Sequence, residues 1–145
     1  MPSEPITPPA SLSKEEYETL ALHRYVIQQF LHFSEGVLQK AGLTPQQYQA
    51  MLAIKALPDR DYMTMGELAE CLLIRPHSAV GLINRLEALG LVVRQTPKTD
   101  RRQIHLRLTE QGCQVLERMA ERHVGKWRQL GPQLRALCQR LGEAA

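Results

Sequence analysis

The sequence of 145 residues has few cysteines, no long apolar run, and no basic-then-apolar stretch at its start. A membrane span needs roughly 20 apolar residues and a secretory leader needs a basic and then an apolar segment, so we expect a cytoplasmic protein without membrane association. The three cysteines, Cys71, Cys113 and Cys138, are far apart and form no CxxC pair, which argues against a disulfide framework or a zinc ribbon. We expect them to be free, buried thiols.

Catalytic and metal-binding patterns are also missing. The sequence contains no nucleophile–base constellation, no Gly-rich phosphate loop and no full set of metal ligands. His32 and Glu35 have helical i, i+3 spacing, but two ligands are too few for a metal site, and a packed or exposed histidine is the plainer interpretation. We therefore expect no enzyme activity, no metal and no cofactor. A metal-dependent enzyme is the weakest of three hypotheses, and stoichiometric metal in the purified protein would support it.

What the sequence does have is an uneven distribution of charge. The whole chain carries a net charge of +3 and is 43% hydrophobic, which fits one compact globular domain. Residues 75–108 hold seven positive and two negative side chains, hence +5, which leaves −2 for the other 111 residues. Positive charge concentrated in one segment indicates a polyanionic partner such as nucleic acid.

Local signals outline the N-terminal part of the chain. Residues 1–12 hold four of the nine prolines and no periodicity, which predicts a flexible arm. Ser13, followed three residues later by Glu16, forms a capping box, and apolar residues then recur at helical spacing. We therefore expect a long helix over about 14–40.

Three further helices have similar start signals. Thr44, followed by proline and then by Gln47 at the third helical position, opens one that stops before the next proline. Thr64, followed three residues later by Glu67, repeats the capping box and opens a short helix over about 65–72. Pro76 opens a third that ends at Gly90. Because the last two are joined by a tight connection, they predict a helix-turn-helix if their apolar faces meet.

The helix over 76–89 has one apolar and one polar face. Its apolar side groups Ala79, Val80, Leu82, Ile83, Leu86 and Leu89. Its polar side shows His77, Ser78, Gly81, Asn84, Arg85 and Ala88. Glycine costs a helix about 0.5–1 kcal/mol relative to alanine, so Gly81 on the outward face favours close approach to a partner.

The C-terminal part begins with strands. Two short strand-like runs, 91–96 and 104–108, flank a cationic loop and predict a hairpin, or wing, attached to the helix-turn-helix. Thr109 then caps a helix over about 110–130, Gly131-Pro132 breaks it, and a last short helix follows. The expected fold is mainly α with a small β-hairpin: a winged helix-turn-helix preceded and followed by other helices.

This order of elements over residues 13–141 resembles the MarR family of bacterial transcriptional regulators. The matching motifs are LTPQQYQAMLAI, INRLEALGLVVR and the wing tip Thr99-Asp100-Arg101-Arg102, followed by LRLTEQG. The resemblance implies an obligate homodimer that binds palindromic operators in double-stranded DNA as a repressor or, less often, an activator. It also implies a small-molecule effector, which we interpret as an aromatic or phenolic anion that forces the two winged regions into a spacing unsuited to DNA.

The resemblance divides the chain into functional parts within one compact domain. Residues 13–43 would be a dimerisation helix, 44–108 the winged helix-turn-helix DNA-binding region, and 109–145 the C-terminal dimerisation helices. The first helix and the last two have apolar stripes that the small winged region cannot cover, which independently favours a partner chain.

Two features depart from the family's pattern. Arg75 stands where the recognition helix would have a Ser, Thr or Asp cap, so this helix should begin less well capped, and we interpret Arg75 as a phosphate contact. The family's peroxide-sensing branch has a reactive cysteine in its first helix. Residues 13–41 contain none, which disfavours a redox sensor of that type.

We expect the helix over 76–89 to enter the major groove of DNA. Arg85 would reach guanine and Asn84 adenine, each through two hydrogen bonds. Arg102 matches the wing arginine that reaches the minor groove in the family, and Asp100 would orient a nearby arginine by a charge-assisted bond. The complete set of predicted DNA-binding residues is Arg75, His77, Ser78, Gly81, Asn84, Arg85, Arg94, Lys98, Thr99, Asp100, Arg101, Arg102 and Gln103.

Plainer alternatives stay open for several of these residues. Asn84 and Arg85 would otherwise form a solvated helix face, and Asp100 with Lys98 would merely form a turn. At the level of the whole protein, the alternative is a winged-helix protein-interaction module that does not bind DNA. For the effector, the resemblance places a crevice between the dimerisation helices and the winged region, with His23, His32 and Tyr48 as candidates to line it.

Overall fold

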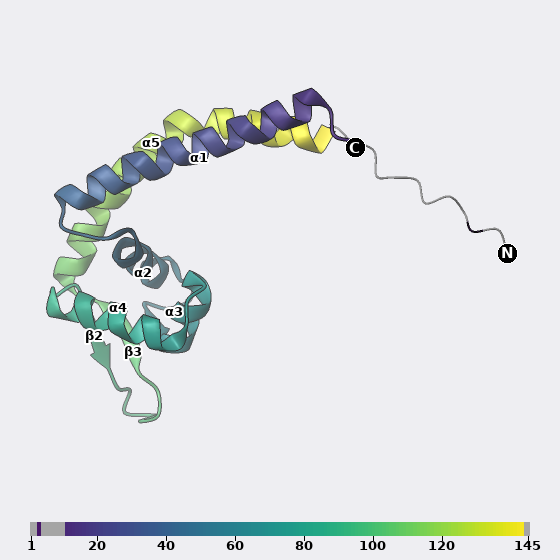
Figure 1. Ribbon diagram of the computed structural model, residues 1–145. Coiled ribbons are helices and arrows are strands. Elements are labelled where there is room, and N and C mark those ends of the chain that lie inside the picture. The colour runs from purple at the N-terminus through teal and green to yellow at the C-terminus, as the bar shows by residue number, and fades with distance from the viewer. Residues whose placement is uncertain (1–2, 4–10, 144–145) are drawn as a thin grey trace.

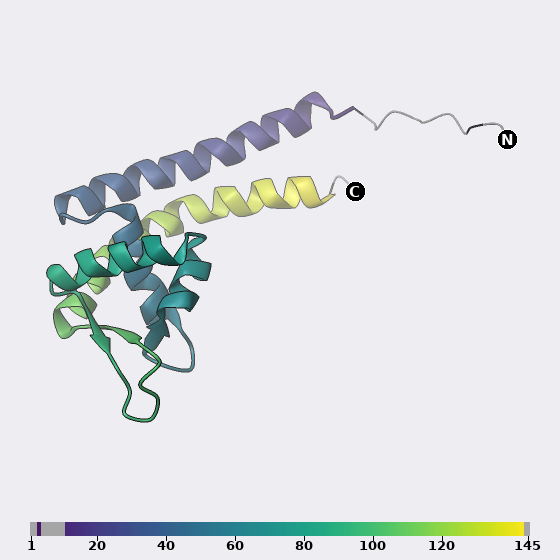
Figure 2. The ribbon, with the colours of Figure 1, turned by 60° about the horizontal axis from the view of Figure 1, so that its bottom comes forward.

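The computed structural model describes residue 3 and residues 11–143 of the chain. Along them the elements are α1 (Lys14–Lys40), α2 (Pro45–Ala56), β1 (Tyr62–Thr64), α3 (Met65–Leu72), α4 (Pro76–Ala88), β2 (Val92–Gln95), β3 (His105–Leu108) and α5 (Glu110–Glu143). α1 and α5 run side by side at one end of the molecule, and the hairpin of β2 and β3 projects at the other (Figure 1, Figure 2). The prediction of a mainly helical winged fold is confirmed, whereas the predicted arm over 1–12 lies almost wholly outside the described residues. No helix in the described ranges combines the length and apolar content needed to cross a membrane.

The first two helices begin at the capping boxes predicted from the sequence. The hydroxyl of Ser13 accepts a hydrogen bond from the backbone N–H of Glu16 at 3.1 Å, and the Glu16 carboxylate accepts one from the Ser13 N–H at 3.0 Å. Thr44 and Gln47 make the same reciprocal pair at 3.2 and 3.0 Å. Local chemistry therefore fixes where α1 and α2 start.

The third predicted capping box, at Thr64, is only half formed. The Thr64 hydroxyl accepts from the backbone N–H of Glu67 at 3.3 Å, but the Glu67 carboxylate does not return a bond to the backbone. Instead it accepts from the Thr64 hydroxyl at 2.9 Å and from the guanidinium of Arg60. Burial raises the pKa of Glu67, but the hydrogen bonds from Thr64 and Arg60 outweigh burial, so the pKa lies below its ordinary value. The Glu67 carboxylate, which would have completed the capping box, thus binds the guanidinium of Arg60 on the preceding turn instead.

The sheet has three antiparallel strands in the order β1-β3-β2, one more than the predicted hairpin. β1 places Met63 opposite Leu106 of β3, and β2 places Val92 opposite Leu108. β1 was missed because three residues are too few to show an alternating pattern. Its pairing gives the hairpin the third strand that an isolated pair would need for stability in water.

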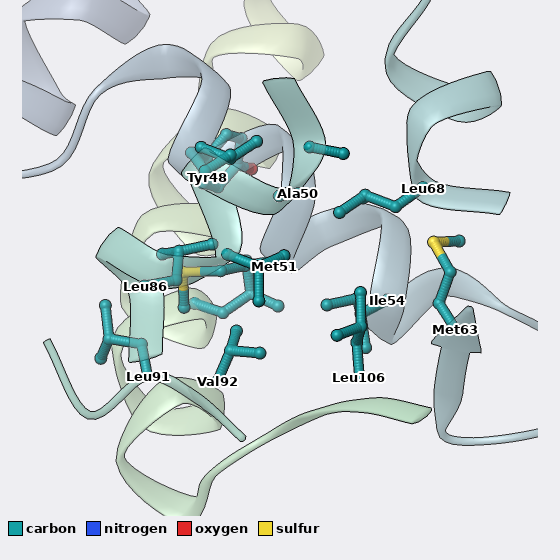
Figure 3. Packing of buried hydrophobic residues seen from close by; sticks show 14 of the residues in the cluster. Tyr48, Ala50, Met51, Ile54, Met63, Leu68, Leu86, Leu91, Val92 and Leu106 are labelled. Atoms are coloured by element: carbon teal, nitrogen blue, oxygen red, sulfur yellow. The ribbon is translucent and has the colours of Figure 1, made fainter. Parts of the chain in front are cut away.

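The main core lies between α2, α3, α4 and the sheet (Figure 3). Its largest fully buried side chains are Leu38, Met51, Ile54, Leu68, Ile83, Leu86, Val92 and Leu106. α4 contributes a narrower stripe than predicted, since Val80 and Leu89 are 40% and 48% exposed. The remaining four residues of the predicted apolar face have the i, i+3, i+4, i+7 spacing of a single stripe, and they are buried.

α5 is continuous from Glu110 to Glu143, so the predicted break at Gly131-Pro132 is wrong. A proline inside a helix removes one N–H and crowds a preceding carbonyl, at a cost of about 3 kcal/mol. Leu130 and Leu137, one on each side of Pro132, are both buried in a second cluster with Val26 of α1. Burial on both sides of the proline keeps the two halves of α5 in one helix.

The three cysteines are free, but they are not buried as predicted. Cys71 and Cys138 are exposed and Cys113 is half-buried. On α3 the core positions are taken by Leu68 and Ala69, which turns Cys71 toward solvent. Helix position, rather than the general tendency of cysteine to be buried, decides its exposure here.

Candidate nucleic-acid interface and ligand cavity

The outward face of α4 is polar and sterically open. His77, Ser78, Asn84 and Arg85 are exposed, as the helical periodicity predicted. A Cβ added to Gly81 would meet no atom within 4 Å, so packing within the chain does not require glycine there. The face therefore offers hydrogen-bonding groups around a central residue without a side chain.

The start of α4 is uncapped by any side chain, as predicted. Arg75 occupies the cap position without a side-chain hydrogen bond to the helix, and Pro76 fills the first helical position. The preceding turn passes through Leu73, whose φ of 56° lies in the left-handed region. The exposed guanidinium of Arg75 forms no ion pair within the described residues, and the positive end of the helix dipole lies beside it. An anion is thus favoured at this end of α4.

The wing tip is exposed throughout residues 98–103. One carboxylate oxygen of Asp100 accepts from the backbone N–H of Arg102 at 3.0 Å, and the Asp100 carbonyl accepts from the N–H of Gln103 at 3.3 Å. Asp100 therefore shapes a turn, which was the plainer of the two interpretations. The expected charge-assisted bond from Asp100 to an arginine side chain is not among the ion pairs of the described residues.

The side chains of Arg94 and Asn84 are joined by a hydrogen bond. The Arg94 guanidinium donates to Oδ1 of Asn84 at 2.6 Å and to the carboxylate of Glu87 at 3.3 Å, which ties β2 to α4. A two-bond contact to adenine needs both the carbonyl and the amide N–H of asparagine. The Asn84 carbonyl already accepts from Arg94, so a two-bond contact to adenine, which stays a prediction, would have to share this oxygen or replace its bond to Arg94.

Cations without acidic partners remain at the winged end of the molecule. Five exposed cations at the winged end form no ion pair within the part of the chain that the structure describes. They are Arg75, Arg85, Lys98, Arg101 and Arg102. Asp100 is the one acidic residue in the sequence of the loop between β2 and β3. Unpaired cations beside a polar helix face can contact phosphates while the helix meets base edges.

A cavity of about 490 Å³ lies between α1, α2 and α5. Its lining comprises Phe30, Leu31, Ser34, Glu35, Leu38, Pro45, Tyr48, Gln49, Leu52, Ala120, His123, Val124 and Trp127. The volume falls in the range of small-molecule sites in proteins, and the lining is mainly apolar and aromatic, as such sites usually are. Burial raises the pKa of the Tyr48 phenol, which keeps that hydroxyl protonated.

Of the three predicted effector residues, Tyr48 lines the cavity, whereas His23 and His32 do not. His23 lies nearer the start of α1, where its Nδ1 donates to the carbonyl of Thr19 at 3.0 Å and its Nε2 lies 3.3 Å from Sγ of Cys138. His32 is exposed, on a different face of α1 from its cavity-lining residues. Neither histidine belongs to a cluster of three potential metal ligands within the described ranges.

His123 is a central cavity residue that the sequence analysis missed. Its Nδ1 donates to the carbonyl of Met119 at 2.6 Å, and in the neutral ring Nε2 then accepts from the hydroxyl of Ser34 at 2.7 Å. The ring stacks on Tyr48 with centroids 4.5 Å apart and thereby joins α1, α2 and α5. The i, i+4 spacing of His123 and Trp127 places both on one face of α5. The helices that His123 contacts, α1 and α2, are far from it in the sequence, so the local pattern does not reveal the cavity.

Comparison with known proteins points to one family. The sequence profile of the MarR family matches residues 41–103. The HTH-type transcriptional regulator FarR of Neisseria gonorrhoeae is 35% identical over 86 residues, which are 59% of this chain and 56% of FarR. The homoprotocatechuate degradative operon repressor of Escherichia coli is 30% identical over 106 residues, which are 73% of this chain and 70% of that repressor.

The solved structures agree with the sequence relatives. AbsC, a MarR family transcriptional regulator from Streptomyces coelicolor, is similar with a TM-score of 0.73 and 27% identity over 92% of this chain and 91% of AbsC. The chain spans 56% and 58% of the length of the first two curated relatives it matches. It nevertheless covers 70% of the E. coli repressor and nearly all of AbsC. The chain belongs to the MarR family of winged-helix transcriptional regulators.

Proposed function

We propose that this chain binds a palindromic operator in double-stranded DNA as a homodimer and represses transcription. α4 would enter the major groove, with Arg75, His77, Ser78 and Arg85 at base edges and phosphates, and the wing would reach the minor groove through Arg102. The repressor role is supported by the E. coli relative, which is named as an operon repressor.

The observation that carries the proposal is the set of unpaired cations around the polar face of α4. Arg75 and Arg85 lie on or beside α4, and three more cations lie at the wing tip. A surface used only for folding would have no need of so many exposed positive side chains without acidic partners. Phosphate contacts from several of them would supply salt-dependent affinity, and the polar face of α4 would supply sequence preference.

Exposed apolar side chains on α1 support the homodimer. Those that are at least 40% exposed are Tyr17, Leu20, Leu22, Tyr25, Ile27 and Leu31. An apolar surface of this kind along one helix favours burial against a partner, and a second copy presents the same surface. In a symmetric dimer the two α4 helices would lie about 34–36 Å apart, or a multiple of it, to meet successive major grooves.

The cavity between α1, α2 and α5 is the proposed effector site. It lies where the long helices meet the winged region, so a bound ligand would contact α1 and α5 on one side and α2 on the other. A ligand with a higher affinity for one spacing of the winged regions would shift the dimer toward that spacing. An aromatic ligand suits the cavity because Phe30, Tyr48 and Trp127 line it.

The proposal predicts that the full-length protein enriches specific fragments from genomic DNA. The recovered sites should be inverted repeats with half-site centres about one helical turn apart, or a multiple of it. In mobility-shift titrations, affinity for a recovered site should fall steeply as salt is raised, because phosphate contacts release counterions. A protein-interaction module would instead recover no common sequence and show no salt-sensitive shift, and either result would reject DNA regulation.

Replacing Gly81 with alanine should separate folding from DNA binding. Because nothing lies within 4 Å of the added Cβ, the variant should be more stable by about 0.5–1 kcal/mol in chemical denaturation. Its affinity for the recovered operator should fall, because the methyl group occupies the face of α4 that approaches DNA. Gly125→Ala on α5 is the control, since that position is also open within the chain: it should raise stability similarly and leave DNA affinity unchanged. Full operator affinity in Gly81→Ala would argue against close approach of DNA at this position.

A further inference from the structure

The lining of the cavity between α1, α2 and α5 includes one carboxylate and no lysine or arginine. Among its lining residues, Glu35 is the only one of the Asp, Glu, Lys and Arg types. Glu35 forms no ion pair within the described residues, so its carboxylate lacks a compensating charge there. An anionic ligand would meet a like charge at this site, whereas a cation would meet an opposite one.

Two basic residues of the neighbouring stretch of α5 lie over an aromatic ring outside the cavity lining. Arg122 and Lys126 lie over the ring of Phe33, at 6.0 and 5.2 Å from its centroid. Neither cation lines the cavity, and neither does Phe33. A ligand carboxylate in the cavity would therefore find no lysine or arginine in the lining.

The aromatic groups of the lining favour a cation as well. Phe30 stacks on Trp127 with centroids 4.1 Å apart, and Tyr48 stacks on His123 at 4.5 Å. The negative electrostatic potential over the aromatic faces that these stacks leave uncovered attracts ammonium groups, most strongly for tryptophan. Several aromatic rings with one acidic side chain therefore form a lining suited to an organic cation.

Few hydrogen-bond donors in the cavity lining are free to bind an anion. The hydroxyl of Ser34 is already bonded to His123, and Nδ1 of His123 to the carbonyl of Met119. The remaining neutral side-chain donors of the lining are the hydroxyl of Tyr48, the amide of Gln49 and the indole N–H of Trp127. These suit a ligand hydroxyl, but they do not offset the full charge of a carboxylate.

We propose that the cavity binds aromatic cations, molecules with an aromatic ring and a protonated amine, with the ring among Phe30, Tyr48 and Trp127 and the ammonium at Glu35. The proposal rests on the proposed effector role of this cavity and reverses the sign of charge expected from the family resemblance. It makes the carboxylate of Glu35 one source of the preference for a cation, and the cation–π attraction of the rings the other.

The test uses three probes of similar size that differ in charge: tyramine (cationic), tyrosol (neutral) and 4-hydroxyphenylacetate (anionic). In isothermal titration calorimetry with the full-length protein, tyramine should bind about tenfold more tightly than tyrosol, through ion pairing and cation–π attraction. 4-Hydroxyphenylacetate should bind most weakly. Glu35→Gln should lower tyramine affinity about threefold and leave tyrosol affinity unchanged, because Glu35 is exposed and its charge is screened.

Glu18→Gln is the matched control, since it removes the same charge from α1 at an exposed residue outside the cavity lining. It should leave the affinities of all three probes unchanged. The proposal is overturned if 4-hydroxyphenylacetate binds as tightly as tyramine, if no probe binds, or if Glu35→Gln and Glu18→Gln behave alike.

Mobility shifts with the recovered operator separate this proposal from the proposed function. Tyramine binding that leaves the protein–DNA complex intact would support the ligand class and reject an effector role. Operator binding without any tyramine binding would support DNA recognition and reject the ligand class.

Discussion

Replacing Gly112 with alanine is expected to lower the free energy of unfolding by about 3 kcal/mol. Gly112 is buried in the first turn of α5, and a Cβ built there would lie 2.1 Å from the carbonyl oxygen of Leu91. That oxygen belongs to the backbone, so no side-chain rotation relieves the overlap, and it also accepts the N–H of Thr109 at 3.0 Å. To make room, the start of α5 must separate from the chain that enters β2.

Chemical denaturation and thermal melting measure this effect directly. A loss of about 3 kcal/mol should lower the melting temperature of a domain of this size by about 6–12 °C. Gly125→Ala, in the same helix but with no atom within 4 Å of the added Cβ, should instead raise stability by about 0.5–1 kcal/mol. If both variants were equally stable, the close packing of α5 on Leu91 would be contradicted.

The sequence predicted the helix cap at Thr109 but could not predict the close packing of Gly112 on Leu91. Thr109 was expected to cap the helix after the wing, and its hydroxyl accepts the N–H of Gly112 at 2.9 Å and donates to the carbonyl of Gly90 at 2.6 Å. The cap is a local signal within four residues. The need for glycine at 112 comes from Leu91, on the other side of the wing, and no local pattern reveals that contact.

The same distinction, between local signals that the sequence shows and distant contacts that it does not, applies to the whole fold. α1 and α2 begin where their capping residues predicted, because the hydrogen bonds concerned join residues three apart. β1 and the uninterrupted α5 were missed because both depend on distant packing: β1 on its pairing with β3, and Pro132 on the burial of its neighbours against α1. The cavity was missed in most of its residues for a similar reason, since it exists only where three helices meet.

At the candidate DNA interface, residue types were easier to predict than residue partners. The cationic tip and the polar face of α4 follow from composition and helical periodicity, and both are exposed. The bond from Arg94 to Asn84 and the turn formed by Asp100 depend on side-chain geometry, which a pattern of residue types does not contain. Arg102 is therefore a cleaner test of DNA binding than Asn84 or Arg94.

Replacing Arg102 with alanine is expected to weaken binding to the recovered operator by about tenfold or more and to reduce the slope of log affinity against log salt by about 1. The Arg102 side chain is exposed and forms no ion pair in the described part of the chain. Its backbone N–H, which donates to Asp100, is retained in alanine. The free energy of unfolding should therefore change by less than about 0.5 kcal/mol. Mobility shifts over a range of salt concentrations, together with denaturation, measure both effects.

Two further variants separate a specific wing contact from a general effect of net charge. Arg128→Ala removes one exposed positive charge from α5 and should leave both affinity and salt slope nearly unchanged, because this residue lies outside α4 and the wing. Arg102→Lys keeps the charge, so it should restore the salt slope, but an ammonium lacks the planar donors of guanidinium and should restore only part of the affinity. If Arg128→Ala and Arg102→Ala weakened binding equally, the wing would contribute only to the long-range field, and the minor-groove contact would be rejected. Full recovery in Arg102→Lys would reduce the role of Arg102 to a phosphate contact and leave sequence recognition to α4.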